Sequence, residues 1–191
     1  MRKKIVLLLV VSLLFSGVLA GCRKKAEVLP EDGFPAIKVV SGKNNIEWVV
    51  GMNRLGNTEC DREDNLLLLM KDRVPENLVH LENGEDITVE FDGAVPDAIK
   101  LTEHIIRPDG SPKYTTEHEG TVIDAALKKG KATFTIEKNY VTALSSYSGD
   151  YAPGATLKGY RLLCNWGSDQ CEYTFVIRGD AAITMLPEES E

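Results

Sequence analysis

The C-terminal part of the chain contains two extended runs separated by a tight turn, and this pattern restricts the fold most strongly. Residues 157–165 and 171–178 are rich in apolar and β-branched side chains, and Trp166-Gly167-Ser168-Asp169 joins them. If Gly167-Ser168 forms a two-residue turn, the facing pairs are Trp166 with Asp169, Cys164 with Cys171, Leu162 with Tyr173 and Tyr160 with Phe175. Every pair is chemically compatible, so the sequence predicts an antiparallel hairpin.

The hairpin brings two of the four cysteines face to face. Opposed residues of an antiparallel pair lie within the Cα separation of about 4.4–6.8 Å that a disulfide tolerates. We therefore expect Cys164 and Cys171 to form a disulfide. A zinc site is the competing interpretation, but two cysteines at this spacing with no nearby histidine do not match zinc-binding motifs. Cys60 is left as an odd thiol that is a small buried residue, a reactive group or a thiol that pairs between chains.

Apolar and polar residues alternate in several other segments, which recur about every ten to fifteen residues. The predicted strands are 36–41, 45–52, 78–81, 86–92, 99–105, 113–115 and 131–137. Only one short helix is expected, over 66–71, with Asp64 or Asn65 as its N-cap. This spacing predicts an all-β fold, an immunoglobulin-like antiparallel β-sandwich with one short helix.

One strand carries a residue that conflicts with its pattern. Ile99, Leu101 and Ile105 share a face of the predicted strand 99–105, but Glu103 falls on the same face. Either a bulge shifts the register at this point or the strand leaves the core.

Two regions are candidates for partner binding. The segment 139–153 has no clear period and contains Tyr140, Tyr147 and Tyr151 among serines and glycines, a composition that suits recognition surfaces. The alternative is that these tyrosines hold the segment onto the sandwich. Trp166 lies at the hairpin turn, where little core is expected, so we predict that it is exposed and contacts a partner.

Motifs for known catalytic or metal chemistry are missing from the sequence. There is no Gly-x-Ser-x-Gly nucleophile turn, no His-Glu-x-x-His zinc motif and no glycine-rich phosphate loop. Asp61, Glu63 and Asn65 alternate as calcium ligands do, but Leu66 occupies the position that requires glycine. We therefore expect a non-enzymatic protein with no cofactor and no metal. A hydrolase that uses unrecognised carboxylates is an alternative.

The N-terminus contains an export signal. Arg2, Lys3 and Lys4 precede an apolar run that ends in Leu19-Ala20-Gly21-Cys22. The run is about fifteen residues long, short of the roughly twenty that span a bilayer. Its end resembles the lipobox of bacterial lipoproteins, which implies cleavage before Cys22 and lipidation of that thiol. The expected organisation is a signal peptide at 1–21, a lipid-anchored linker at 22–34, a β-sandwich domain at 35–183 and an acidic, disordered tail at 184–191.

The charge balance limits the partners of the exported part. The chain has 22 basic and 29 acidic residues, and three of the basic ones lie in the signal, so the remainder has a net charge of about −10. Such a surface repels phosphate backbones, so we do not expect the protein to bind nucleic acid. The expected location is the outer face of the cell membrane.

A second resemblance concerns the C-terminal hairpin. The segments 159–167 and 171–178 resemble the last hairpin of small uncharacterised lipoproteins of Gram-positive bacteria, and similar domains accompany sensor-transducer metallopeptidases. The resemblance implies ligand or protein sensing, although the Ser-x-x-Lys motif of penicillin-acylating sensors is missing here. The sequence therefore predicts a lipid-anchored binding or accessory protein that contacts an envelope protein or an extracellular ligand. The alternatives are an inhibitor of an envelope protease or lytic enzyme, and an envelope hydrolase.

Overall fold

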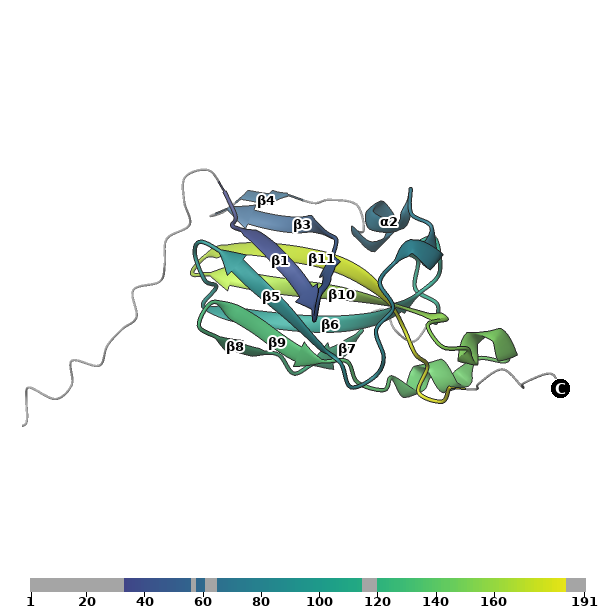
Figure 1. The fold of residues 1–191 in the computed structure, drawn as a ribbon. Coiled ribbons are helices and arrows are strands. Elements are labelled where there is room, and N and C mark those ends of the chain that lie inside the picture. Colours follow the sequence, from purple (N-terminus) through teal and green to yellow (C-terminus); the bar gives the residue numbers. More distant parts are fainter. Residues whose placement is uncertain (1–32, 56–57, 61–64, 115–119, 185–191) are drawn as a thin grey trace, which may run out of the picture.

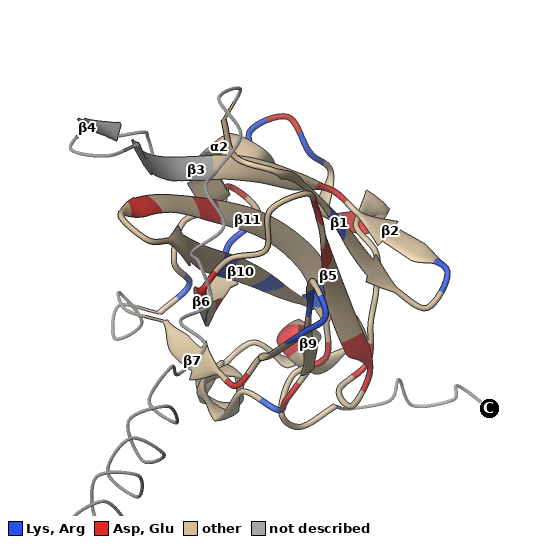
Figure 2. Cartoon of the chain, turned by 90° about the vertical axis from the view of Figure 1, so that its left-hand side faces the viewer, with Lys and Arg blue, Asp and Glu red and all other residues tan. Residues whose placement is uncertain are grey.

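Two antiparallel sheets lie face to face in the computed structural model, with the apolar core between them (Figures 1 and 2). The structure describes residues 33–184 except 56–57, 61–64 and 115–119. The predictions for the signal at 1–21, Cys22, most of the linker and nearly all of the tail lie outside these residues, as do those for Asp61, Glu63 and Asp64. The predicted fold class, an all-β sandwich with one short α-helix, is confirmed.

The two sheets have five and six strands. The five-stranded sheet has the order β2-β1-β5-β9-β8, formed by β1 (Ala36–Ser41), β2 (Asn44–Ile46), β5 (Asp86–Asp92), β8 (Ala126–Lys128) and β9 (Lys131–Thr135). The six-stranded sheet has the order β4-β3-β11-β10-β6-β7, formed by β3 (Trp48–Leu55), β4 (Thr58–Cys60), β6 (Ala98–Ile106), β7 (Thr121–Ile123), β10 (Thr156–Trp166) and β11 (Asp169–Gly179).

Short helical segments connect the strands. They are the α-helix α2 (Asn65–Met70) and the 3₁₀ segments η1 (Pro75–Asn77), η2 (Tyr140–Leu144) and η3 (Ser148–Tyr151). Figure 1 shows α2, η2 and η3 at the end of the sandwich away from the β10–β11 turn.

The predicted C-terminal hairpin has the expected register. Cys164 pairs with Cys171, Leu162 with Tyr173, Tyr160 with Phe175 and Trp166 with Asp169. Gly167 has a φ of 61°, the left-handed conformation that a two-residue turn requires. The hairpin lies in the middle of the six-stranded sheet, between β3 and β6.

The predicted single strand 45–52 is divided between the two sheets. β2 pairs with β1, whereas β3, which starts only two residues after β2 ends, pairs with β11 in the opposite sheet. Ile46, Trp48 and Val50 nevertheless contact one common core, because both sheets turn their inner faces toward it. The alternation of apolar and polar residues therefore predicted the buried face correctly but did not predict the break between β2 and β3.

A second, smaller core lies on the outer face of the six-stranded sheet, under α2. Leu66, Leu69 and Met70 of α2 pack there against residues of β6, β10 and β11. Gly159 permits this contact, because a Cβ at that position would lie 2.6 Å from a methyl carbon of Leu66. The start of β10 is consequently buried on both faces, while its other end alternates between buried and half-buried residues.

Several local predictions differ from the structure. Residues 78–81 meet β11 through the isolated bridge of His80 with Arg178 and form no strand. In the predicted strand 113–115, Lys113 donates a backbone hydrogen bond to Ile105, and Thr115 lies outside the described residues. The short strands β4, β7 and β8 were not predicted, since three residues are too few to establish a period. The predicted capping role of Asn65 is also wrong, since its Oδ1, the atom that would accept from the helix amides, has no hydrogen-bond partner. Its Nδ2 donates to the Glu172 carboxylate at 3.2 Å.

Candidate functional site at one end of the sandwich

Trp166 is buried, which contradicts the prediction that it is an exposed contact residue. Only 3% of its surface is accessible. Its ring lies 5.5 Å from that of Phe34 and 6.4 Å from that of Phe91, and its Nε1 donates to the Ala94 carbonyl oxygen at 3.2 Å. Phe91 of β5 and the segments next to the other sheet therefore cover the Trp166 ring, which is part of the core.

No disulfide joins Cys164 and Cys171, which corrects the predicted disulfide. Both are fully buried, although they face each other as the turn geometry required. Burial raises the pKa of the Cys164 thiol, and the neighbouring Cys171 raises it further. A thiol with a raised pKa is mostly protonated and therefore a poor nucleophile. The pair acts here as two small apolar side chains of the core.

The three tyrosines of residues 139–153, which we call the tyrosine loop, differ in exposure and in their contacts. Tyr140 and Tyr147 are 72% and 70% exposed, and Leu144 between them is similarly exposed. Tyr151 is half-buried, and its hydroxyl donates to the carbonyl oxygens of Ala143 and Ser145. The two alternatives from the sequence thus apply to different residues: Tyr151 holds the loop together, while Tyr140 and Tyr147 face outward.

The start of the loop is attached to the interior through Asn139. Its Oδ1 accepts from the Val141 amide and so caps η2, while its Nδ2 donates to the buried Glu103 carboxylate at 2.9 Å. On the other side of η2, the Thr142 hydroxyl accepts from the Ala182 amide at 2.8 Å. These contacts hold η2 in place, so the outward direction of Tyr140 is a fixed feature of the fold.

Glu103 stays on the core face of β6 without a bulge, so neither explanation offered from the sequence was correct. β6 and β10 pair without a register shift, and Glu103 is 1% exposed. Its carboxylate accepts from the Tyr160 hydroxyl at 2.8 Å and lies 3.5 Å from Lys158 Nζ. Lys158 also donates to the Glu137 carbonyl oxygen at 2.7 Å. A buried charge is tolerated when it is paired and hydrogen-bonded in this way.

The buried pair is a structural element and offers no reactive group. Burial raises the pKa of Tyr160 well above its usual value, and the charge of Glu103 and the hydrogen bond to it raise it further. The hydroxyl therefore stays protonated and donates to Glu103. Glu103, Lys158 and Tyr160 are each exposed by 1% or less, so the network lies inside the core.

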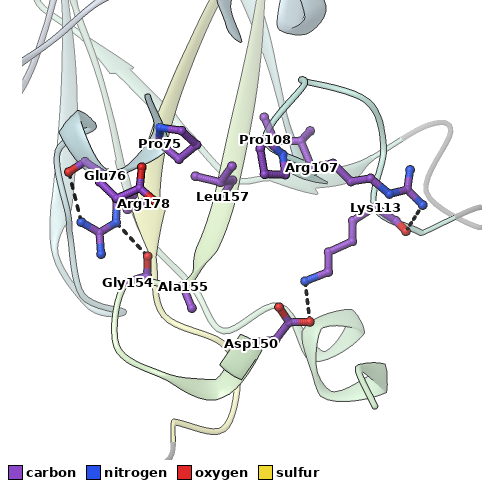
Figure 3. A pocket seen from close by; sticks show the side chains of 11 residues that line it. Pro75, Glu76, Arg107, Pro108, Lys113, Asp150, Gly154, Ala155, Leu157 and Arg178 are labelled. Carbon is purple, nitrogen blue, oxygen red and sulfur yellow. Dashed lines mark hydrogen bonds and ion pairs between the residues drawn. The ribbon is translucent and has the colours of Figure 1, made fainter. Parts of the chain in front are cut away.

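A pocket opens beside the tyrosine loop, on the outer face of the six-stranded sheet (Figure 3). Its volume is about 280 Å³, and it lies between η1, the segment after β6, η3 and the ends of β10 and β11. The lining residues are Pro75, Glu76, Ile106, Arg107, Pro108, Lys113, Asp150, Gly154, Ala155, Leu157 and Arg178. In Figure 3, Leu157 lies at the centre, with Arg178 on one side and Lys113 on the other.

One wall of the pocket is an ion pair with the tyrosine loop. Lys113 Nζ lies 2.6 Å from the Asp150 carboxylate, which also accepts from the Ser145 hydroxyl. Burial raises the pKa of Asp150, but the hydrogen bonds from Lys113 and Ser145 outweigh this effect, so the net pKa is lowered. The carboxylate is therefore charged at neutral pH and fixes η3 to the segment that follows β6.

The exposed loop and the pocket lie at the opposite end of the sandwich from the place where the chain enters the domain. Phe34 contacts Trp166 at the last residue of β10, whereas the pocket contains Leu157, near its first. Eleven residues of extended strand separate these ends by about 35 Å. Figure 1 shows the same arrangement, with the start of β1 at one end and η2 and η3 at the other.

Other kinds of site were sought in the described part of the chain. None of its helices is both long and apolar enough to cross a membrane. It contains no group of three or more His, Cys, Asp or Glu side chains placed to hold a metal ion. Figure 2, viewed from the end at which the chain enters, shows basic and acidic residues interspersed along the strands and loops.

The chain has no detected relative. A scan against protein-family models, a search of curated proteins and a search of solved structures each found no match. We therefore infer the function from the residues of this chain alone.

The residues around the pocket were not predicted from the sequence. Arg107 and Lys113 lie on the segment after β6, Arg178 lies near the end of β11, and none of them belongs to a local motif. The signal that was available is indirect: Pro108-Asp109-Gly110 predicts a turn next to Arg107, and Arg178 ends a strand. Which strand ends meet at one edge depends on the strand order, which the sequence pattern did not provide.

Proposed function

We propose that this chain is a lipid-anchored, non-catalytic binding protein on the outer face of the cell membrane, which contacts another envelope protein through the tyrosine loop. The observation that carries the proposal is the exposure of Tyr140, Leu144 and Tyr147 on a loop whose own hydrogen bonds hold it in place. Rigid, exposed tyrosines bind protein partners at a low cost in conformational entropy.

The position of the loop fits an anchored protein. In the proposal, Cys22 carries the lipid, and the polar segment that follows it leads to Phe34. The loop lies about 35 Å from that end, along the length of β10. A partner in the envelope can therefore contact Tyr140 and Tyr147 without competing with the membrane surface for the same face of the domain.

Site-specific cross-linking on intact cells tests the binding surface. A photoreactive phenylalanine analogue replaces Tyr140 in the full-length protein, and captured proteins are identified by mass spectrometry. The matched control places the same analogue at Val122 of β7, an equally exposed apolar residue outside the loop. We expect one recurrent envelope protein at position 140 and none at 122. Equal capture at both positions, or none at 140, would contradict the proposal.

The anchor is tested separately. We expect Cys22→Ala to abolish incorporation of labelled fatty acid and to release the folded protein from the membrane fraction. Retention of the label in this variant would show that the lipid is attached elsewhere. If the captured partner is a protease or lytic enzyme whose activity falls on binding, the protein is an inhibitor of that enzyme.

A further inference from the structure

The pocket beside the tyrosine loop combines an apolar floor with charged walls. Ile106 and Leu157 form part of the floor and are almost completely buried, and they belong to the small core under α2. Arg178 and Lys113 lie on opposite sides of Leu157 (Figure 3). A concave apolar surface with a few placed polar groups is the usual form of a small-molecule site.

Arg178 is held in a fixed position but is not neutralised. Its Nε donates to the Gly154 carbonyl oxygen at 2.9 Å and its Nη1 to the Glu76 carbonyl oxygen at 3.4 Å. Both acceptors are uncharged backbone oxygens. Among the described residues, no carboxylate lies within ion-pair distance of this guanidinium. The charge of Arg178 is therefore available to an anionic ligand, and its orientation is already set.

The surroundings favour an anion. The pocket is lined by three cationic side chains, Arg107, Lys113 and Arg178, against two carboxylates, Glu76 and Asp150. Asp150 is occupied by Lys113 and Ser145. The remaining balance is positive, in a chain whose net charge is −7. Such a local excess of positive charge on an acidic protein attracts anions to this pocket in preference to the rest of the surface.

The size of the pocket limits the ligand. A volume of about 280 Å³ lies just below the range of roughly 300–1,000 Å³ that holds drug-sized molecules. A ligand with a single charged group and a short branched hydrocarbon part fits both the volume and the apolar floor. An extended chain of several residues does not fit within it.

We propose that this pocket binds a small carboxylate with one apolar group, its anionic end on Arg178 and its hydrocarbon part on Leu157 and Ile106. Carboxylates match the planar guanidinium with two parallel hydrogen bonds, which a spherical anion cannot form. The site is independent of the protein-binding role of the tyrosine loop, although Asp150 is common to the loop and the pocket wall.

An NMR titration of the full-length protein in detergent micelles tests this assignment, with 4-methylpentanoate as the probe. We expect saturable shifts of the Gly154 and Ala155 amide signals, with a dissociation constant on the order of 1 mM. The neutral amide of the same acid should bind about tenfold more weakly, because it lacks the charge. Inorganic phosphate, which lacks the hydrocarbon part, should also bind about tenfold more weakly.

Variants separate the pocket from general charge effects. Arg178→Gln should weaken binding of 4-methylpentanoate by about tenfold or more. Lys113→Gln should weaken it by a smaller factor, because it leaves the Asp150 carboxylate at the pocket wall without its cation. Lys131→Gln is the matched control, because Lys131 is an exposed cation on β9 that pairs with Glu90 outside the pocket. It should leave binding unchanged. If Arg178→Gln does not fold, Lys113→Gln decides the test.

Three results would overturn the proposal. The first is the absence of saturable shifts with 4-methylpentanoate up to about 20 mM, twenty times the expected dissociation constant. The second is equal binding of the acid and its amide, or of the acid and phosphate. The third is unchanged affinity in the folded pocket variants, or an equal loss in Lys131→Gln. Capture of an envelope protein by the tyrosine loop is unaffected by any of these results, so the two proposals fail separately.

Discussion

The two ends of the sandwich differ in the exposure of their aromatic residues, which are buried at one end and exposed at the other. At the hairpin end, Trp166 closes the space between the sheets against Phe34 and Phe91, and its indole nitrogen has a backbone acceptor. At the other end, Tyr140 and Tyr147 project from short 3₁₀ segments into solvent. The comparison teaches that an aromatic residue at a turn is not a contact residue by default. What matters is whether a distant segment covers it.

The largest expected difference between the two ends is the effect of a substitution on the free energy of unfolding. Trp166→Ala removes a buried indole and its hydrogen bond, so we expect it to lower the free energy of unfolding by about 4 kcal/mol in a urea titration. Tyr140→Ser removes an exposed ring and should change that energy by less than about 0.5 kcal/mol. Similar values for the two variants would remove the distinction between a structural end and a binding end.

The buried ion pair connects the interior to the loop end and should have the next largest effect. Lys158→Met leaves Glu103 charged and without its cation in the core, at an expected cost of about 3 kcal/mol in the same urea titration. The double variant Lys158→Met/Glu103→Gln removes both charges and should be more stable than Lys158→Met alone. If the single and double variants are equally unstable, the charge of Glu103 is not what makes Lys158 necessary.

Within the loop, Tyr151 should differ from its exposed neighbours. Tyr151→Phe removes the two hydrogen bonds to the Ala143 and Ser145 carbonyl oxygens, an expected loss of about 1 kcal/mol. Hydrogen exchange should show faster opening of η3, with little change in β10 and β11. Slower exchange, or a change spread over the whole sandwich, would argue against a local role.

The smallest expected effect is a dependence on pH at the pocket wall. Because the pKa of Asp150 is lower in the folded protein than the unfolded value of about 3.9, its ion pair with Lys113 stabilises the fold fully above that value. The contribution is lost as the pH falls through the folded pKa. We expect Asp150→Asn to be less stable than wild type by under about 1 kcal/mol at pH 6, since solvent screens this pair.

The same comparison at pH 3 checks the sign. Wild type and Asp150→Asn should then differ less in their urea midpoints than at pH 6, because the wild-type carboxylate begins to lose its charge. A difference that grows toward low pH would mean that another group is responsible.

Local sequence pattern was sufficient where one turn determines the geometry. Gly167-Ser168 set the register of the hairpin and placed Cys164 opposite Cys171. The state of those thiols did not follow from the register, because facing positions permit a disulfide without requiring one. The short helix was predicted within one residue at each end, since its leucines and methionine have no alternative in a strand pattern.

The remaining errors share a physical cause, which is contact between segments far apart in sequence. Trp166 is covered by residues from β5 and the start of the domain, and Glu103 is compensated by Lys158 and Tyr160 on the neighbouring strand. The pocket forms where η1, the segment after β6, η3 and the ends of β10 and β11 meet, and these segments are far apart in the sequence. Without the strand order, the sequence does not show that a cation lies next to Glu103 or that other segments cover Trp166.

The place of β10 and β11 in the six-stranded sheet has a consequence for how the chain acquires its structure. These last two strands lie between β3 and β6, so neither of those earlier strands has its central partner until the C-terminal hairpin is present. Such non-local pairing slows folding and leaves unpaired strand edges exposed in the meantime. The six-stranded sheet is therefore completed only after nearly the whole chain has been synthesised.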